Sequence, residues 1–435
     1  MRDDVENGGG VEKLNMQPPH PPFGPLLPPG EKGDRAETQA MPLFTPQRLV
    51  MLVFFLQPIA YGSWLPRIPE IQAGLGLGPA SLALALLGMP CGTLITLPFA
   101  GPLVGRIGAR TAILAGFVLY SIAVSLPALA PDIILLFLAL MAAGSAISFV
   151  ELGLNVQADL VEKASGRLIM NTSHGCWSLG IMAGSLIGSG FAAAGIAPQL
   201  AVPLVAIVVL PAALLVGKVL PTLSDAAPAG ETRRSAWSLP SPALVGICLF
   251  VFGITMTEGA MADWSAIFLR DALAADGGLV GLGYSVFAFM VAAGRFGGDL
   301  LKRRFGAVGT ARLCGTLSLL GGIVLFFAPD VALALLGFGI IGVGVSVGFP
   351  LAVTAAAGLG DRAASANVAV LSFVALCGFL IGPPLIGFVA EHADIRFGIA
   401  CVVPVLALSL LLTGRLTPRS SRPVHASEAD IPGVL

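Results

Sequence analysis

The chain has 435 residues, of which 56% are hydrophobic and only 11% charged, and its mean hydropathy is +0.89. Soluble domains carry about 25% charged residues, and a single water-soluble core stops growing well before this length, so the composition excludes an ordinary soluble protein. The net charge of −1 excludes the basic surface that binds nucleic acid. The lipid bilayer is the remaining solvent, and we expect an all-α membrane protein.

Both ends of the chain are polar. Residues 1–44 contain Pro-Pro pairs, a run of three glycines and mixed charges, which is typical of a disordered tail. No apolar segment precedes residue 43, so we expect no cleaved signal peptide. Residues 417–435 form a second polar tail.

Residue types that bind metals or carry out catalysis are scattered along the chain. The six cysteines lie in apolar stretches without a C-x-x-C pair, so neither disulfides nor a zinc site is expected. His174 and Cys176 are two positions apart, which places them on different helix faces. We therefore expect no enzyme, no metal and no cofactor.

The apolar stretches divide into helices long enough to cross a bilayer, which takes roughly 20 residues. Charged residues and Gly, Pro and Asp turns separate these stretches, and we predict twelve spans in chain order. They lie at 46–66, 79–104, 110–130, 132–160, 167–194, 198–220, 241–269, 279–301, 308–328, 331–357, 363–391 and 395–415. Several connections are very short, so neighbouring spans must be antiparallel.

Cationic residues are concentrated in alternate loops. The loops on the side of the membrane opposite both tails have only three cationic residues, Arg67, Arg270 and Arg396. The side shared with both tails has Arg106, Arg110, Lys163, Arg167, Arg233, Arg234, Lys302, Arg303, Arg304, Arg312 and Arg362. Because Lys and Arg mark cytoplasmic loops, both termini are predicted to be cytoplasmic, in the inner (plasma) membrane. We expect a monomer.

The longest break between spans, 221–240, divides the chain into two six-span bundles at 45–220 and 241–416. The halves resemble each other: 101–108 after the second span matches 298–306 after the eighth, and Gly144 and Ser148 match Gly342 and Ser346. Such a repeat is typical of a duplicated transporter, whose site lies between the halves. Small-xxx-small pairs such as Gly184 with Gly188 and Gly378 with Gly382 favour close helix contacts, or reflect the general abundance of glycine in membrane helices.

Glu151 is the acid placed deepest in a predicted span. A carboxylate at the centre of a span costs about 2.5–3.5 kcal/mol, so it usually faces a wet cavity. Ser148, Glu151 and Asn155 are spaced i, i+3, i+7 and share one helix face. Burial favours the protonated acid, and an acid that gains and loses a proton in a cavity would suit proton coupling. The alternative is a neutral acid that hydrogen-bonds a neighbouring helix.

The seventh predicted span contains two further acids. Thr255 and Glu258 follow helical spacing, and we interpret Glu258 as a second proton-coupling candidate and Thr255 as a binding residue. Asp263 lies five residues after Glu258 and is expected to point elsewhere, either into the binding site or near the outer interface. Trp264 beside it is interpreted as an interfacial anchor.

Polar and aromatic residues in the first, fifth and eleventh spans complete the candidate binding site. An aromatic face with amide and hydroxyl partners suits a sugar-like solute, because rings cover its C–H faces while amides bind its hydroxyls. Ordinary interhelical hydrogen bonding is the alternative, and His174 could instead be a packing histidine. The candidates are Gln57 and Tyr61, then Asn171, His174 and Trp177, and finally Asn367.

The loop at 101–110 resembles the cytoplasmic signature loop of the major facilitator superfamily. The signature normally has an Asp where this chain has Gly105, whereas the second copy keeps Asp299 near basic residues. The resemblance covers roughly 46–416 and implies a twelve-helix transporter fold with a charged cytoplasmic gate. The gate residues that it implies are Gly101, Arg106, Gly108, Arg110, Asp299, Arg303 and Arg304.

Residues 151–155 together with 171–180 are similar to the fucose:proton symporter branch of that superfamily. The resemblance implies that Glu151 carries the proton or holds the substrate, with Asn155 as its neighbour. That branch has an Asp in the first span, which this chain lacks, so Glu258 could substitute. Residues 258–265 and 382–391 resemble bacterial relatives of largely unassigned substrate, including rhizopine-type (inositol-derivative) transport proteins.

Three functions are consistent with these patterns. The first is a proton-coupled carrier of a sugar or another polyhydroxylated solute, with the solute, protons and the bilayer as its partners. The second is a proton-driven exporter of drugs or metabolites, for which an apolar, aromatic cavity is expected. The third is a membrane sensor that binds its ligand without transporting it.

Overall fold

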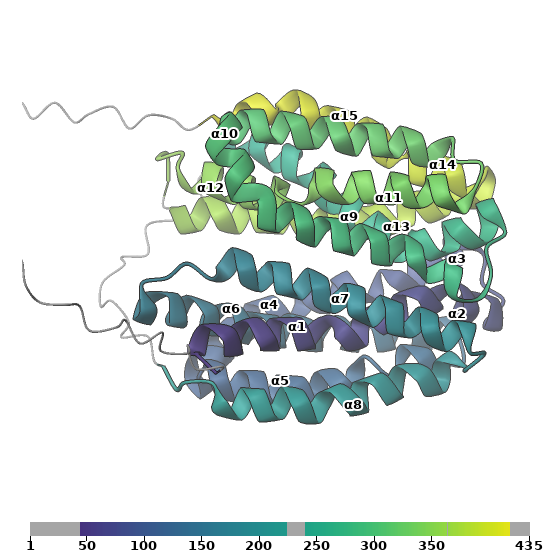
Figure 1. Ribbon diagram of the computed structural model, residues 1–435, viewed down its shortest axis with the longest axis horizontal. Coiled ribbons are helices and arrows are strands. Elements are labelled where there is room, and N and C mark those ends of the chain that lie inside the picture. Colours follow the sequence, from purple (N-terminus) through teal and green to yellow (C-terminus); the bar gives the residue numbers. More distant parts are fainter. Residues whose placement is uncertain (1–43, 224–239, 363, 418–435) are drawn as a thin grey trace, which may run out of the picture. The chain divides into compact units, whose positions relative to one another are not determined.

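The computed structural model describes residues 44–223, 240–362 and 364–417. Apart from Phe44 and Thr417, the expected tails at 1–44 and 417–435 therefore lie outside the described residues, as does most of the linker at 221–240. The described residues belong to one compact unit. Helices make up this unit, and no strand occurs in the described ranges (Figure 1).

The first half of the unit contains eight α-helices. Thr45 caps α1 by accepting a hydrogen bond from the backbone N–H of Arg48, and Asp132 caps α6 in the same way through Leu135. The elements are α1 (Pro46–Trp64), η1 (Leu65–Arg67), α2 (Ile68–Gly74), α3 (Pro79–Leu86), α4 (Gly88–Ile107), α5 (Ala109–Ala123), η2 (Pro127–Leu129), α6 (Ile133–Ser165), α7 (Met170–Ala193) and α8 (Pro198–Val219).

The second half is built from seven α-helices. Ser241 caps α9 and Asp330 caps α11, again by accepting a hydrogen bond from a backbone N–H three residues later. The elements are α9 (Pro242–Leu273), η3 (Gly277–Gly281), α10 (Leu282–Phe326), α11 (Val331–Val345), α12 (Gly348–Ala357), α13 (Ala364–His392), α14 (Ile395–Ala400), α15 (Val402–Leu412) and η4 (Thr413–Leu416).

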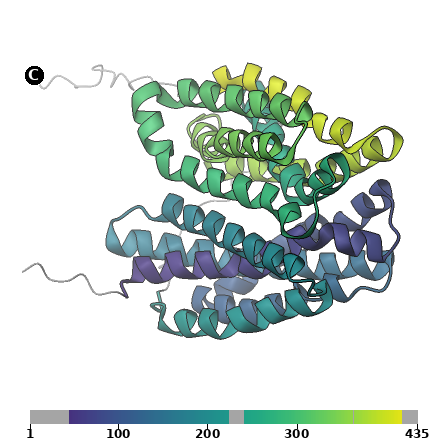
Figure 2. The ribbon, with the colours of Figure 1, turned by 45° about the vertical axis from the view of Figure 1, so that its right-hand side comes forward.

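The twelve-span prediction is confirmed once α10 is divided. Eleven segments of the described chain are long and apolar enough to cross a membrane, and one of them, Gly277–Phe326, has 50 residues. At 1.5 Å per residue this segment would be about 75 Å long, more than twice the bilayer core. It turns back at Gly306, whose φ of 69° is left-handed, and so forms two spans (Figures 1 and 2).

The two halves repeat one packing scheme. In the first half α1 packs against α7, and in the second α9 packs against α13, which are the equivalent first and fifth spans of each half. Between the halves, α7 packs against α10 and α3 packs against α13. These two contacts are also equivalent, since each joins the fifth span of one half to the second span of the other. The interface between the halves is thus itself pseudo-symmetric.

Glycine permits the close approach of α1 and α7. A Cβ atom added at Gly184 would collide with the carbonyl oxygen of Ile59, and one at Gly180 with that of Phe55. Gly188 lies as close to Ser63, so the small-xxx-small pair Gly184 and Gly188 packs against α1 as predicted. A Cβ atom added at Gly378 of α13 would likewise collide with Thr255 and Met256 of α9, whereas one at Gly382 would meet Met256 only at 3.3 Å.

Replacing Gly184 by alanine is expected to destabilise the protein by about 1–3 kcal/mol, because the added methyl group must push α1 away. Thermal unfolding in detergent would detect the change. Gly190→Ala on the same helix is the matched control, since its Cβ would meet nothing within 4 Å. Equal unfolding temperatures for the two variants would contradict this packing.

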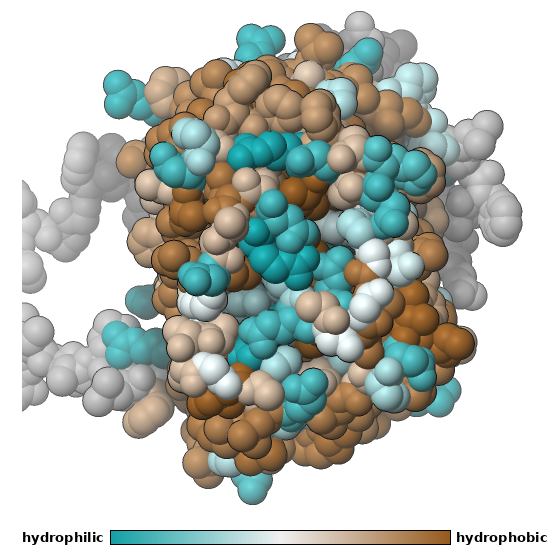
Figure 3. Space-filling view, turned by 90° about the vertical axis from the view of Figure 1, so that its right-hand side faces the viewer, coloured by the Kyte–Doolittle hydropathy of each residue, from teal (hydrophilic) through white to brown (hydrophobic). Residues whose placement is uncertain are grey.

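The surface is that of a protein embedded in lipid. Large apolar side chains such as Ile95, Phe99, Ile207 and Leu411 are exposed. One end, which includes α2, α3 and the turn between α13 and α14, is polar across its middle and flanked by apolar surface (Figure 3). A bilayer would solvate such flanks, and water would solvate the polar end.

Candidate functional site

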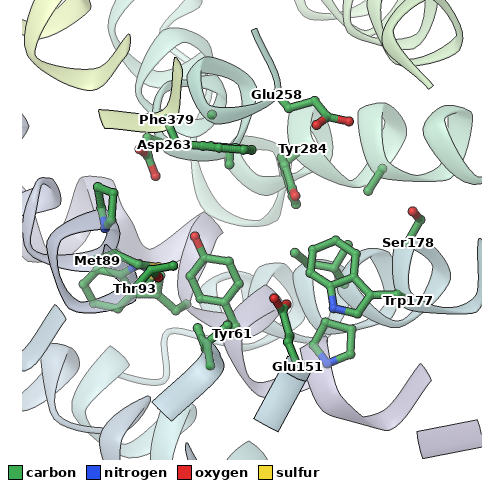
Figure 4. A pocket seen from close by; sticks show the side chains of 18 of the residues that line it. Tyr61, Met89, Thr93, Glu151, Trp177, Ser178, Glu258, Asp263, Tyr284 and Phe379 are labelled. Atoms are coloured by element: carbon green, nitrogen blue, oxygen red, sulfur yellow. The ribbon is translucent and has the colours of Figure 1, made fainter. Parts of the chain in front are cut away.

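A cavity of about 280 Å³ lies between the two halves. Helices α1, α3, α4, α6 and α7 line it from the first half, and α9, α10 and α13 line it from the second. Its polar and aromatic side chains point toward one another across the gap between the halves (Figure 4). They are Gln57, Tyr61, Trp64, Thr93, Glu151, Trp177, Ser178, Glu258, Asp263, Tyr284, Phe287, Arg295 and Phe379.

Glu151 enters the cavity from α6, as the sequence predicts. Its carboxyl group lies between Tyr61 and Trp177 (Figure 4). The indole Nε1 of Trp177 donates a hydrogen bond of 2.7 Å to Oε1 of Gln57, which holds the ring against the cavity. No cation pairs with Glu151 among the described residues. The predicted residues Gln57, Tyr61, Trp177 and Glu151 therefore lie together.

Glu258 belongs to a network centred on Arg295 of α10. Arg295 Nη2 lies 3.4 Å from Oε1 of Glu258, and both side chains are 18% exposed. Arg295 Nη1 donates across the interface to Oγ of Ser178 at 2.8 Å and to the carbonyl oxygen of His174 at 3.3 Å. One guanidinium thus joins an acid of the second half to α7 of the first half.

Asp263 also lines the cavity. It points in a different direction from Glu258, as five-residue spacing predicts, and faces Tyr61 across the cavity (Figure 4). No hydrogen bond or ion pair joins its carboxylate to another residue in the part of the chain that the structure describes. The interpretation of Trp264 as an interfacial anchor is wrong, because this side chain is fully buried against Gly387 of α13.

Four other candidate residues do not line this cavity. Thr255 is buried, and its hydroxyl donates to carbonyl oxygens of its own helix. Ser148 is buried nearby on α6. Asn155 donates to the carbonyl oxygen of Glu151, and its Oδ1 lies 3.2 Å from Nε2 of His174. Asn367 donates to the carbonyl oxygen of Ala356 and to Asp361, which connects α13 to the end of α12.

Asn171 and His174 line a second cavity, of about 330 Å³, between α7, α10 and α12. Asp299 and Lys302 lie on its wall. Arg295 lines both cavities, so the Arg295 network separates them.

The predicted gate residues lie at helix ends away from the first cavity. Gly108, with a φ of 81°, ends α4 and starts α5, while Gly101 and Arg106 on α4 are exposed. Arg110 binds Thr222 at 2.9 Å and the carbonyl oxygen of Lys218, and so joins α5 to the end of α8. On α10, Asp299 faces the second cavity, and Arg303 and Arg304 are exposed beside the turn at Gly306.

The halves are joined by hydrogen bonds at the opposite end, to which no predicted gate residue contributes. Arg270 of α9 donates to the carbonyl oxygen of Pro69 at 2.8 Å and to Oε1 of Gln72 at 2.7 Å. The backbone N–H of Ala80 donates to Glu391 at 3.2 Å, and Oγ of Ser285 donates to Oγ of Ser185 at 2.9 Å.

Sequence reasoning missed Arg295 and Tyr284. A signal for Arg295 was present, because it is the single charged residue between 282 and 298 in an apolar span. Tyr284 has no such signal: only the fold shows that it faces Tyr61 rather than lipid (Figure 4).

Residues 50–368 match the family model of the Major Facilitator Superfamily. The chain belongs to the major facilitator superfamily. Within that superfamily it is 31% identical to an uncharacterised MFS-type transporter of Yersinia pestis, over 85% of this chain and 94% of that protein. It is 27% identical to the membrane protein MosC of Rhizobium meliloti, over 82% of this chain and 86% of MosC.

Solved structures share the superfamily fold. A mutant of the nucleoside transporter NupG covers 86% of this chain with a TM-score of 0.71 and 12% identity, and all of that chain is covered. A bacterial homologue of the lysosomal transporter Spinster, in an inward-facing conformation, covers 85% of this chain and 97% of its own, with a TM-score of 0.64 and 16% identity. The protein is thus a multi-pass membrane transporter of small molecules and not an enzyme.

Proposed function

We propose that this major facilitator protein moves a small polyhydroxylated solute by proton-coupled alternating access. The observation that carries the proposal is the 280 Å³ cavity between the halves, into which Glu151 points with no cationic partner in the described part of the chain. Rocking of the halves would open such a cavity to each side of the membrane in turn.

The walls of the cavity suit a sugar-sized solute. Its volume is close to the lower end of small-molecule sites, which span roughly 300–1,000 Å³. Tyr61, Trp177 and Tyr284 offer ring faces for C–H groups, and Gln57 and Ser178 offer hydrogen-bonding groups near them. Asn155, Asn171, His174 and the other residues outside this cavity would act indirectly, by positioning helices α6, α7 and α13.

Glu151 is the better proton site of the two predicted acids. Arg295 stabilises the ionised form of Glu258, whereas no cation among the described residues pairs with Glu151. We assign proton exchange to Glu151, and to Glu258 the task of holding or releasing Arg295. Since Arg295 bonds to α7, its release would loosen the interface between the halves.

The uneven distribution of cations supports the orientation proposed from the sequence. The loops with Arg106, Lys163 and Lys302 would face the cytoplasm, together with both termini, in the inner membrane. The second cavity would then be on the cytoplasmic side, and the Arg270 contacts would close the outer side. Gly101, Arg106, Gly108, Arg110, Asp299, Arg303 and Arg304 would form the inner gate of a monomer.

Proton-driven export of an amphipathic compound is the second candidate. The apolar part of the lining favours it, since Leu86, Met89, Phe287 and Phe379 face the cavity. Import by symport and export by antiport differ in the direction in which protons move when solute is added.

Thermal-shift screening of the purified protein against sugars, polyols and amphipathic drugs would first identify a ligand. The ligand would then be added to proteoliposomes that contain a pH-sensitive dye. Symport predicts that protons enter the vesicles together with the added solute. Antiport predicts that protons leave the vesicles as the solute enters. Binding without any solute flux would contradict both and favour a sensor.

A further inference from the structure

The cavity contains more negative than positive groups. Glu151, Glu258 and Asp263 line it, and Arg295 is its single cationic lining residue among those described. Arg295 pairs with Glu258 and not with the other two acids. If Glu151 carries the coupled proton, Asp263 remains as an unbalanced acid.

Asp263 is a half-buried acid that lacks a partner for its carboxylate among the described residues. It lies in the interior of α9, so it does not cap a helix end. An ionised carboxylate without a cation or N–H donors is costly in a weakly polar site, and a protonated acid would still need an acceptor for its O–H group. Neither partner is present among the described residues, so the missing group must come from the contents of the cavity.

The surroundings of Asp263 favour a cation as that missing group. Tyr61, Met89 and Phe379 line the same part of the cavity as Asp263, and Glu258 lies on the other side of Tyr284 in Figure 4. Aromatic faces attract an ammonium group through their π-electrons, and methionine is polarisable. An anionic solute group would be repelled by Asp263 at this end of the cavity, and a neutral group would leave the carboxylate of Asp263 without a counter-charge.

We propose that the transported solute carries a protonated amine, which binds Asp263 as a charge-assisted hydrogen bond. This inference rests on the proposed function, because it names the charge of the solute in the same cavity. The ammonium end would lie beside Asp263 and Tyr61, and the rest of the molecule would extend toward Trp177 and Glu151.

Matched pairs of compounds that differ in a single amine test the proposal. Binding of glucose, glucosamine and N-acetylglucosamine, and of cyclohexanol and cyclohexylamine, would be measured by intrinsic tryptophan fluorescence on the full chain, at a pH where the amines are charged. The amines are expected to bind at least about tenfold more tightly than their neutral partners. Asp263→Asn, which removes the negative charge, should abolish this preference. Asp263→Glu, which keeps the charge, should retain part of it.

Asp276→Asn is the matched control, since it makes the same chemical change at an exposed position outside the cavity and should keep the preference. Equal affinity for amine and neutral partner, failure of every amine to bind, or a preference that survives Asp263→Asn would overturn the proposal. If neutral sugars are carried with protons while amines are not, this inference fails and the proposed function stands. If amines bind at Asp263 but no solute crosses the membrane, the proposed function fails and the site stands.

Discussion

Replacing Arg295 by glutamine is expected to reduce transport by about 100-fold or more. The guanidinium joins Glu258 to Ser178 and to the carbonyl oxygen of His174, so the variant loses these two hydrogen bonds between α10 and α7. It also leaves Glu258 in the cavity without its cation, which is unfavourable because the carboxylate is largely shielded from water. Solute counterflow in proteoliposomes would measure the loss.

Arg312→Gln provides the control, because Arg312 is an exposed residue of the same helix α10 and lines neither cavity. Combining Arg295→Gln with Glu258→Gln should recover part of the lost thermal stability, since the double variant no longer leaves a charged Glu258 without its cation. Wild-type counterflow in Arg295→Gln, or strictly additive stability changes, would contradict the network described here.

Replacing Glu151 by glutamine is expected to abolish proton uptake driven by solute, while binding and solute exchange persist. Glutamine keeps the size of the side chain beside Trp177 but cannot gain or lose a proton. The pH-sensitive dye in proteoliposomes reports proton uptake, and counterflow at equal pH reports exchange.

Asp159→Asn is the matched control for this experiment, since Asp159 is a half-exposed residue of α6 that pairs with Lys163. It should leave proton uptake unchanged. Proton movement of wild-type size in Glu151→Gln would remove Glu151 from the coupling mechanism and would leave Asp263 or Glu258 as the proton site.

Much of the fold can be predicted from the sequence, because a bilayer dictates the length and the polarity of each span. The limits of most helices follow from charges and from Pro, Gly and Asp turns, including the two spans that meet at Gly306. The equivalence of the halves is visible in their repeated loops. These features depend on composition along the chain, which sequence reasoning reads directly.

The site could be predicted only in part, because a helix in a bundle has protein neighbours on several sides. Burial cost marks Glu151 and Glu258 as residues that need a polar environment, and both line the cavity. Helical spacing cannot distinguish a residue that faces a cavity from one that packs against a neighbouring helix. The sequence predicts that Thr255 binds the solute and that Trp264 lies at the membrane interface, but both pack against α13. The pairing of Arg295 with Glu258 joins positions 37 residues apart, and only the fold brings them together.

Labelling of a cysteine in the cavity tests most directly whether the cavity opens to both sides of the membrane. Ala262→Cys, in a chain without its six native cysteines, places a thiol on the cavity wall between Glu258 and Asp263. Membrane-impermeant thiol reagents should label it when added from either side of a vesicle, and should not label Ala260→Cys, which is fully buried on the same helix. Labelling of Ala262→Cys from one side only, or from neither, would contradict alternating access through this cavity.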